Sequence, residues 1–172
     1  MELKIMRIYF PQPKMEVRAR LHERLAPKTC AWVWDLLTEP VENEVWHVKF
    51  LGRALTCRHS LPQPEVPLQP ENLTITPAAG DLLLVNFTEE TGRSRGTNFT
   101  EEGEEPEKFT GPNTYAGFDL FYGPDSRMLI PMGWHAACHF ASITDNLAGL
   151  ARVAHLTRLE GIKKVIFSRA AT

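Results

Sequence analysis

The sequence predicts a single, mainly β domain, a closed or half-open barrel of about eight strands with two packing α-helices. Two observations support this class. Short strand patterns recur along most of the chain, whereas only one early and one late segment have apolar residues at helical spacing. The 172 residues, 43% hydrophobic and 23% charged, suffice for one sizeable core. We therefore expect one domain over residues 1–172.

A β-hairpin is predicted at the start of the chain. Apolar residues alternate with polar ones over 3–10 and again over 15–21, on either side of the sequence PQPK. The second run keeps a strict period of two, which predicts one buried face and one solvated, charged face.

A helix from about Pro27 to Leu37 is predicted next. Proline suits the first helical turn. The apolar residues that share one face at helical spacing are Ala26, Cys30, Val33, Trp34 and Leu37. Trp32 lies roughly opposite to this face, so it is either partly exposed or covered by another element or by a second subunit.

The middle of the chain predicts strands on both sides of a proline-rich loop. Residues 45–50 and 54–60 have strand patterns, and the prolines within 62–70 then exclude both a helix and a central strand. Strands resume at 73–77 and 82–87. The continuous run LLLV in the latter predicts a strand that is covered on both faces.

Residues 89–112 are predicted to form a long mobile loop. The segment is hydrophilic and contains glycines and the acidic run EEGEEPEK. Loops of this length are usually functional lids or disordered segments, and the self-repelling acidic run favours disorder here.

The last third of the chain predicts further strands, at 115–123, 127–133, 139–143 and 162–169. A helix is predicted before the final strand. Thr144 or Asp145 can cap it, and Gly161 suits its end. Its apolar stripe is formed by Leu147, Leu150, Ala151 and Ala154.

Three segments resemble the cyclophilin family. LAPKTCAWVWDLL (25–37) is similar to the early cyclophilin helix, and GDLLLVNF (80–87) to a barrel strand that begins with glycine. FASITDNLAGLARV (140–153) is similar to the passage into the second cyclophilin helix. The chain as a whole most resembles the bacterial and archaeal cyclophilin-like proteins of unknown function. The resemblance implies a cyclophilin-like barrel around the two helices.

The resemblance implies that a catalytic arginine, if one is kept, is Arg58 in TCRHSLP. In cyclophilins an arginine stabilises the twisted X-Pro amide during isomerisation. The surrounding pattern differs, because Thr56 and Cys57 stand where the family has Phe-His and Pro62 falls one residue later. The glutamine- and glycine-containing run that lines the family's proline pocket has no counterpart. A divergent peptidyl-prolyl cis-trans isomerase is therefore the alternative reading rather than the first.

The stretch GWHAACHFASITDN raises the question of a metal site. His135 and His139 are four residues apart, which on a helix would place both on one face. The glutamate of a zinc-binding HExxH motif is absent, and Pro131 and Gly133 disfavour a helix. On a strand the two histidines point to one side and Cys138 to the other.

A metal would therefore need further ligands from His59, Glu65 or Asp119, because such a site requires three or four converging ligands. A metal-dependent enzyme is the second alternative, and we expect no cofactor. No base that would activate Cys138 as a nucleophile is identifiable.

The first hypothesis is a pocket at the barrel that binds a small molecule or a peptide. Aromatic residues with a few polar groups are the usual lining of such a site. The residues predicted to bind the ligand are Arg58, His59, Phe118, Trp134 and His139. The competing interpretation is that the aromatic residues among them belong to the core.

Composition argues against several classes of partner. A formal net charge of −2 and a pI near 6.3 give no broad positive field for nucleic acid. No apolar run approaches the roughly 18 residues of a membrane span, and the first residues lack a cleavable signal pattern. Three scattered cysteines fit reduced thiols. We expect a cytoplasmic protein without nucleic-acid or membrane partners, and the sequence leaves a homo-oligomer open.

Overall fold

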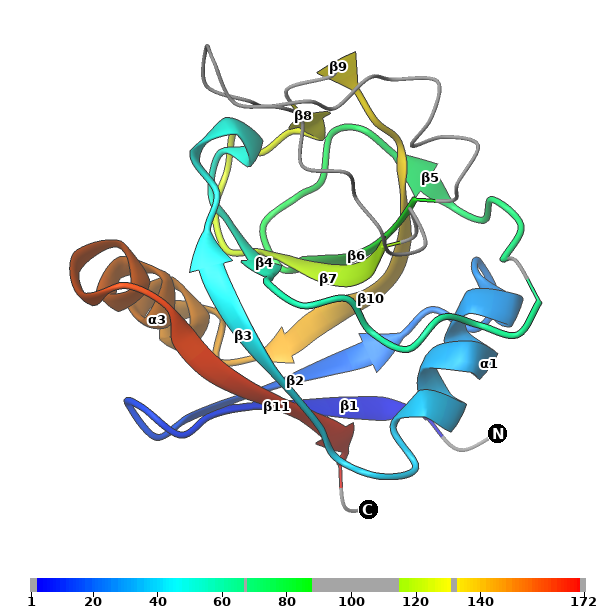
Figure 1. Cartoon of the computed structure of the whole chain (residues 1–172), viewed down its shortest axis with the longest axis horizontal. Helices are drawn as coiled ribbons and strands as arrows, with labels where there is room; N and C mark the ends of the chain where they lie inside the picture. Colours follow the sequence, from blue (N-terminus) through cyan, green and yellow to red (C-terminus); the bar gives the residue numbers. More distant parts are fainter. Residues whose placement is uncertain (1–2, 67, 88–114, 131–132, 171–172) are drawn as a thin grey trace, which may run out of the picture.

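The computed structural model describes residues 3–66, 68–87, 115–130 and 133–170 (Figure 1). Nine strands form one antiparallel sheet in the order β2-β1-β11-β3-β4-β7-β6-β10-β5, and β2 also pairs with β10. This last pairing closes eight of the strands into a barrel, and a short two-stranded sheet, β8-β9, stands beside it. The predicted fold class is confirmed.

The strands have the following bounds. The first half of the chain contains β1 (Ile5–Phe10), β2 (Met15–Leu21), β3 (Val41–His47), β4 (Ala54–Cys57) and β5 (Leu73–Thr74). The second half contains β6 (Asp81–Phe87), β7 (Tyr115–Phe121), β8 (Leu129–Ile130), β9 (Gly133–Trp134), β10 (Ala137–Asp145) and β11 (Lys163–Arg169). The helices are α1 (Pro27–Leu36), the short 3-10 helix η1 (Lys49–Leu51) and α3 (Leu147–Glu160). The predicted hairpin and both predicted helices are therefore present.

The main core lies inside the barrel. Phe118 packs against Phe140 and Phe167 with ring centroids 5.0 and 5.1 Å apart. The helices α1 and α3 lie on opposite sides of the barrel (Figure 1) and pack most of the apolar residues that their spacing predicts against the main core. Trp32 is partly buried against this core, so the chain itself covers part of its ring.

A second apolar layer covers the outer face of β4, β7, β6 and β10. Leu82 and Leu84 of β6 face the main core, while Leu83 and Val85 belong to the second layer with residues of η1 and β8. Successive side chains of a strand point to opposite faces. The run LLLV is thus buried on both sides, as its composition predicts.

The cap of α3 differs from the prediction. Its N-cap is Asn146, whose side chain accepts a hydrogen bond from the Gly149 amide at 3.2 Å. Asp145 instead accepts a hydrogen bond from the Arg18 amide at 2.7 Å, because β10 continues to pair with β2 up to this residue. The expectation of Thr144 or Asp145 as the cap was wrong.

The stretch that contains His135, Cys138 and His139 is extended, as predicted. All three cysteines of the chain are buried and free, and burial raises the pKa of the Cys138 thiol to about 11. Within the described residues, no helix is long and apolar enough to cross a membrane. The predicted loop at 89–112 lies outside the described residues.

Candidate functional site

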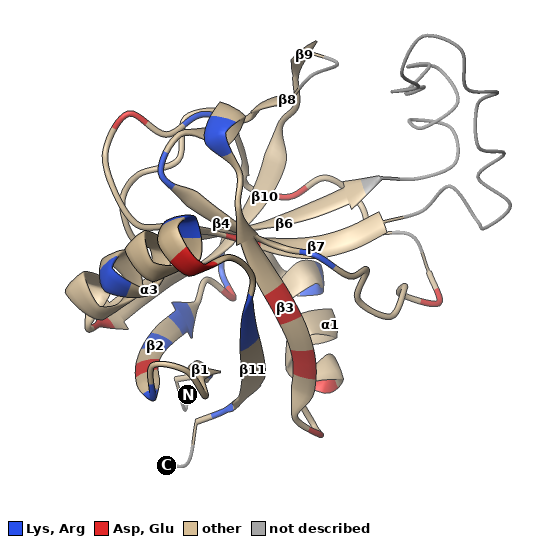
Figure 2. Cartoon of the chain, turned by 60° about the vertical axis from the view of Figure 1, so that its left-hand side comes forward, with Lys and Arg blue, Asp and Glu red and all other residues tan. Residues whose placement is uncertain are grey.

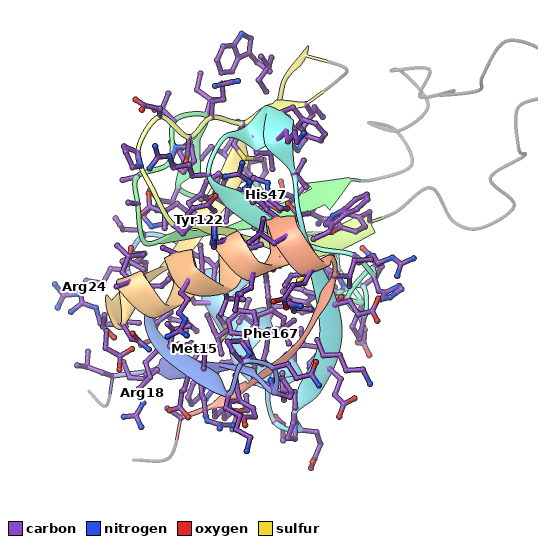
Figure 3. All side chains as sticks on the ribbon, turned by 90° about the vertical axis from the view of Figure 1, so that its left-hand side faces the viewer. Met15, Arg18, Arg24, His47, Tyr122 and Phe167 are labelled. Atoms are coloured by element: carbon purple, nitrogen blue, oxygen red, sulfur yellow. The ribbon has the colours of Figure 1, made fainter. Side chains whose placement is uncertain are left out.

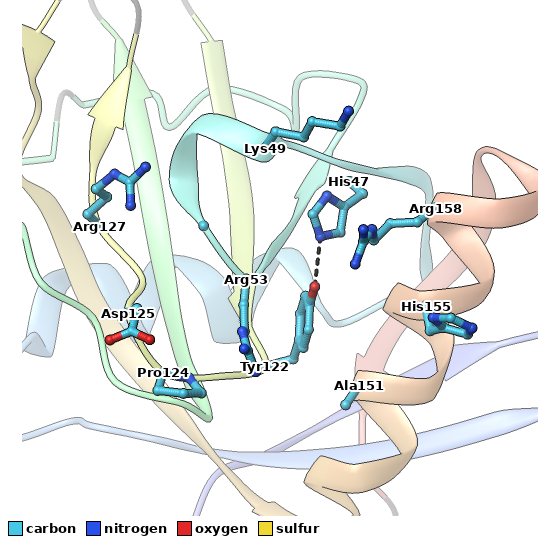
Figure 4. A pocket seen from close by; sticks show the side chains of 11 residues that line it. His47, Lys49, Arg53, Tyr122, Pro124, Asp125, Arg127, Ala151, His155 and Arg158 are labelled. Atoms are coloured by element: carbon cyan, nitrogen blue, oxygen red, sulfur yellow. Dashed lines mark hydrogen bonds between the residues drawn. The ribbon is translucent and has the colours of Figure 1, made fainter.

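A groove with a basic lining lies between α3 and the connections that follow β3 and β7 (Figure 4). Its volume is about 580 Å³. We call it the basic groove and define it by its titratable lining residues, which are His47, Lys49, Arg53, Arg127, His155 and Arg158, together with Tyr122. Basic residues of η1 and α3 lie toward the same side of the molecule (Figure 2).

One wall of the basic groove is a face of α3. Ala151, His155 and Arg158 follow one another at spacings of four and three, which places them on one side of the helix. Residues of the opposite side, among them Leu150 and Val153, are fully buried against the barrel. The helix is therefore held by its apolar face while its basic face borders the groove.

The other wall is built by η1 and the segment after β7, which are tied together. The Arg127 amide donates a hydrogen bond to the Leu51 carbonyl at 3.0 Å. Gly52 has a φ of +88°, and a Cβ atom at this position would lie 2.9 Å from the Asp125 carbonyl oxygen. Only glycine fits this close approach without strain. The wall that carries Lys49, Arg53 and Arg127 is therefore well defined.

His47 and Tyr122 form the centre of the basic groove (Figures 3 and 4). The His47 Nε2 and Tyr122 Oη atoms are 2.7 Å apart and share a hydrogen bond. Burial lowers the pKa of His47, and the nearby Arg158 and Lys49 lower it further. Burial raises the pKa of Tyr122. Both groups are thus neutral at neutral pH, and the Nδ1 atom of His47 is buried without a partner.

Among the described residues, the cations of the groove have no acidic partner. Within the described part of the chain, Lys49, Arg53, Arg127 and Arg158 form no ion pair, and Asp125 is the one acidic residue in the lining. Some arginines elsewhere are paired, as Arg7 is with Glu16 at 2.7 Å. A concave site with unpaired cations attracts anions.

Two of the residues predicted to bind a ligand lie together, outside the basic groove. Arg58 and His59 both contact Glu44, at 2.8 and 3.3 Å. The ion pair lowers the pKa of Glu44. His59 also lines a separate cavity of about 470 Å³ with Asn43 and Glu44.

The other three predicted residues lie elsewhere. Phe118 is 0% exposed in the main core, and Trp134 is 55% exposed on β9. His139 lies on the outer face of β10, 3.0 Å from the Ser142 hydroxyl and 3.2 Å from Asp81. The structure thus groups Arg58 with His59 but does not bring the five residues to one opening. Ligand binding by any of them stays a prediction.

The residues proposed as metal ligands do not converge in the described part of the chain, where no group of three or more His, Cys, Asp or Glu side chains could hold an ion. His135 and His139 lie on an extended segment rather than on a helix. Asp119 is only 2% exposed on β7, and its Oδ1 atom has no partner. Burial raises the pKa of this carboxyl to about 7.

Sequence reasoning missed the basic groove, because its residues come from segments far apart in the chain. The one local signal is the spacing of Ala151, His155 and Arg158. The sequence reading assigned Ala151 to the apolar stripe of the helix, whereas in the structure it is partly exposed and lines the groove.

The barrel, its strand order and its two helices define the class: a cyclophilin-like β-barrel protein. The sequence then identifies the family, because residues 8–169 match the family described as "Protein of unknown function (DUF3830)". The chain belongs to this family. The comparison with curated proteins finds no match.

Two solved structures are similar to the chain. The structure of McbB in complex with tryptophan superposes with a TM-score of 0.63 at 16% identity, covering 97% of this chain and 46% of McbB. The chain therefore spans about half the length of that protein. A cyclophilin-type peptidyl-prolyl cis-trans isomerase from Cryptosporidium parvum superposes with a TM-score of 0.50 at 11% identity, covering 99% of both chains. At these identities the likeness shows the fold alone.

Proposed function

We propose that the protein binds a small anionic molecule in the basic groove. The unpaired cations in a concave site carry this proposal, since each is available to form a charge-assisted hydrogen bond with a carboxylate or a phosphate. The groove volume, about 580 Å³, also lies within the usual range for small-molecule sites. The neutral His47 and Tyr122 pair offers hydrogen bonds that orient the ligand.

The fold is compatible with this role. McbB, which contains a similar barrel, was solved with tryptophan, an amino acid that carries a carboxylate. Fold does not determine function, so this is support by analogy only. We also retain, as part of the proposal, a cytoplasmic protein of bacterial or archaeal origin that has no nucleic-acid or membrane partner.

Thermal unfolding in the presence of anions tests the proposal. A ligand that binds only the native state raises the apparent Tm. We expect inorganic phosphate, citrate or a panel of metabolic acids to raise it. Arg158→Gln should weaken the binding about tenfold or more, because it removes a charge-assisted hydrogen bond.

The matched control is Arg152→Gln, because Arg152 is exposed on the same helix but does not line the groove. It should bind like the unaltered protein. Equal loss in both variants would indicate a general charge effect. The absence of any stabilising anion would refute the proposal.

A divergent prolyl isomerase is the second candidate, supported by the full-length likeness to the Cryptosporidium parvum enzyme. Its predicted arginine, Arg58, is held by Glu44 at 2.8 Å, which leaves the guanidinium less available to a substrate. A protease-coupled assay with a proline peptide decides the question. Isomerase activity that is lost in Arg58→Ala would support this candidate.

A further inference from the structure

The basic groove adjoins a second cavity that has an apolar side. This cavity has a volume of about 380 Å³ and shares His47, Lys49, His155 and Arg158 with the groove. The cavity adds Trp46, Leu159 and Ile162, which we call the apolar annex. Because they share these four lining residues, the groove and the annex adjoin one another.

The annex exposes large apolar side chains. Trp46, Leu159 and Ile162 are 48%, 70% and 42% exposed. One exposed apolar residue is ordinary, but several beside one another indicate a binding surface. These three residues line the cavity that also contains the cations shared with the groove.

The fold brings the annex together from three segments. Lys163 pairs with Val45 in the antiparallel ladder of β11 and β3. One step beyond this pair, the same register brings Ile162 opposite Trp46. Gly161, with a φ of +91°, ends α3 and lets the chain turn back after Leu159. The placement of the three side chains is thus a consequence of sheet register and helix termination.

We propose that the ligand is an amphipathic acid, in which a carboxylate or phosphate head is joined to an alkyl or aromatic tail. The head contacts Arg158 and Lys49, and the tail lies on the apolar annex. This inference rests on the proposed function and specifies its ligand class. The occupant is a small molecule rather than a protein surface, because the apolar residues line a cavity of about 380 Å³ that also contains the cations Lys49 and Arg158.

A series of straight-chain carboxylates tests the inference. Acetate, butyrate, hexanoate and octanoate share one head and differ only in the tail. Affinity measured by calorimetry should rise about two- to fourfold per added methylene. A fully buried methylene group gives the fourfold increase, and a partly buried one gives less. Trp46 fluorescence should change with the longer acids, and Trp46→Phe should remove that change.

The decisive variant is Leu159→Gln combined with Ile162→Thr. Both positions are exposed, so the fold should persist, and glutamine and threonine suit a helix end and a strand start respectively. The dependence on chain length should disappear, while the affinity for acetate and phosphate stays unchanged. The control is Leu25→Gln, which alters an apolar residue that is 58% exposed and does not line the annex.

The outcomes separate this inference from the proposed function. If phosphate and acetate bind but affinity does not rise with tail length, the amphipathic ligand is excluded and the anion site stands. If no acid binds and Arg158→Gln has no effect, the proposed function itself fails. If the double variant instead changes the sedimentation coefficient of the protein, a second copy of the chain covers the annex and the inference is overturned.

Discussion

Two polar regions of the barrel surface differ in whether their polar side chains have partners within the protein. In the basic groove, cations such as Arg158 and Lys49 have no partner within the described residues. In the second region, His22, Asp81, His139 and Ser142 contact one another, and we call them the polar cluster. The Ser142 hydroxyl lies 2.8 Å from His22 Nε2 and 3.0 Å from His139 Nε2.

The polar cluster joins β6, β10 and the residue that follows β2. A β-bulge between His139 and Ala141 lets both His139 and Ser142 face outward, although they are three residues apart. Asp81, at the start of β6, contacts His139 at 3.2 Å and accepts a hydrogen bond from the Ala78 amide at 2.8 Å. Hydrogen-bonding capacity is thus used inside the cluster. A region whose groups satisfy one another stabilises the fold, whereas unpaired groups in a groove are available to a ligand.

Asp119 is a third case and gives the largest expected effect. Its carboxyl has neither a full set of partners nor access to water, and burial raises its pKa from 3.8 to about 7. A carboxyl with a raised folded-state pKa stabilises the fold at low pH and loses that contribution as pH rises from about 4 to about 7. Asp119→Asn should therefore raise the free energy of unfolding at pH 8 by roughly 2–4 kcal/mol.

The same substitution should have a small effect near pH 4, where the carboxyl is protonated in the folded protein. Urea denaturation at the two pH values measures the difference. A destabilised variant at both values would show that Asp119 has an ionised partner.

Removal of the centre of the polar cluster should also have a large effect. Ser142→Ala leaves His22 Nε2 without its hydroxyl partner, whereas His139 Nε2 keeps its contact with Asp81. We expect the free energy of unfolding to fall by about 1–3 kcal/mol, the usual cost of part-buried groups left unsatisfied. Urea denaturation again provides the measurement. An unchanged free energy of unfolding would mean that water replaces the hydroxyl. The groups of the cluster would then be accessible, as those of the groove are.

The polar cluster should also make stability depend on pH. Burial lowers the pKa of His22, and the nearby His139 lowers it further. Because the unfolded chain then binds the proton more readily than the folded protein, stability should fall as pH decreases below about 6.5. His22→Asn should flatten this part of the stability curve. If the variant and the unaltered protein showed the same change of stability with pH, other groups would be responsible for it.

The smallest effect is expected in the basic groove without ligand. Arg158→Gln should change the free energy of unfolding by less than about 0.5 kcal/mol, as for other surface substitutions. Since Arg158 lowers the pKa of His47, the same variant should raise that pKa. An NMR titration of the His47 ring protons tests this. A large loss of stability would place Arg158 among the structural groups and remove the contrast with the cluster.

The candidate sites differ from the barrel in how far the sequence predicts them. His139 was correctly placed on a strand, but its partners were not foreseen, because Asp81 and His22 reach it through the pairing of β6 and β2 with β10. Phe118 was expected at a ligand pocket, yet it lies on the face of β7 that points into the main core. Arg58 and His59 point to Glu44 of the neighbouring strand, a contact without any local signal.

The sequence by itself predicted the mainly β barrel, the first hairpin and the two helices, but residues 49–51, expected within a strand, form the 3-10 helix η1. Period-two and helical patterns, glycines and prolines act over a few residues, and burial of the apolar faces leaves few ways to arrange them. Only the tertiary structure decided which polar residues meet. His47, Tyr122 and Arg158 are separated by 75 and 36 residues along the chain, and strand order, register and the position of α3 place them in one groove. The physical reason is that local patterns specify which face of an element is buried, whereas sites depend on contacts between elements.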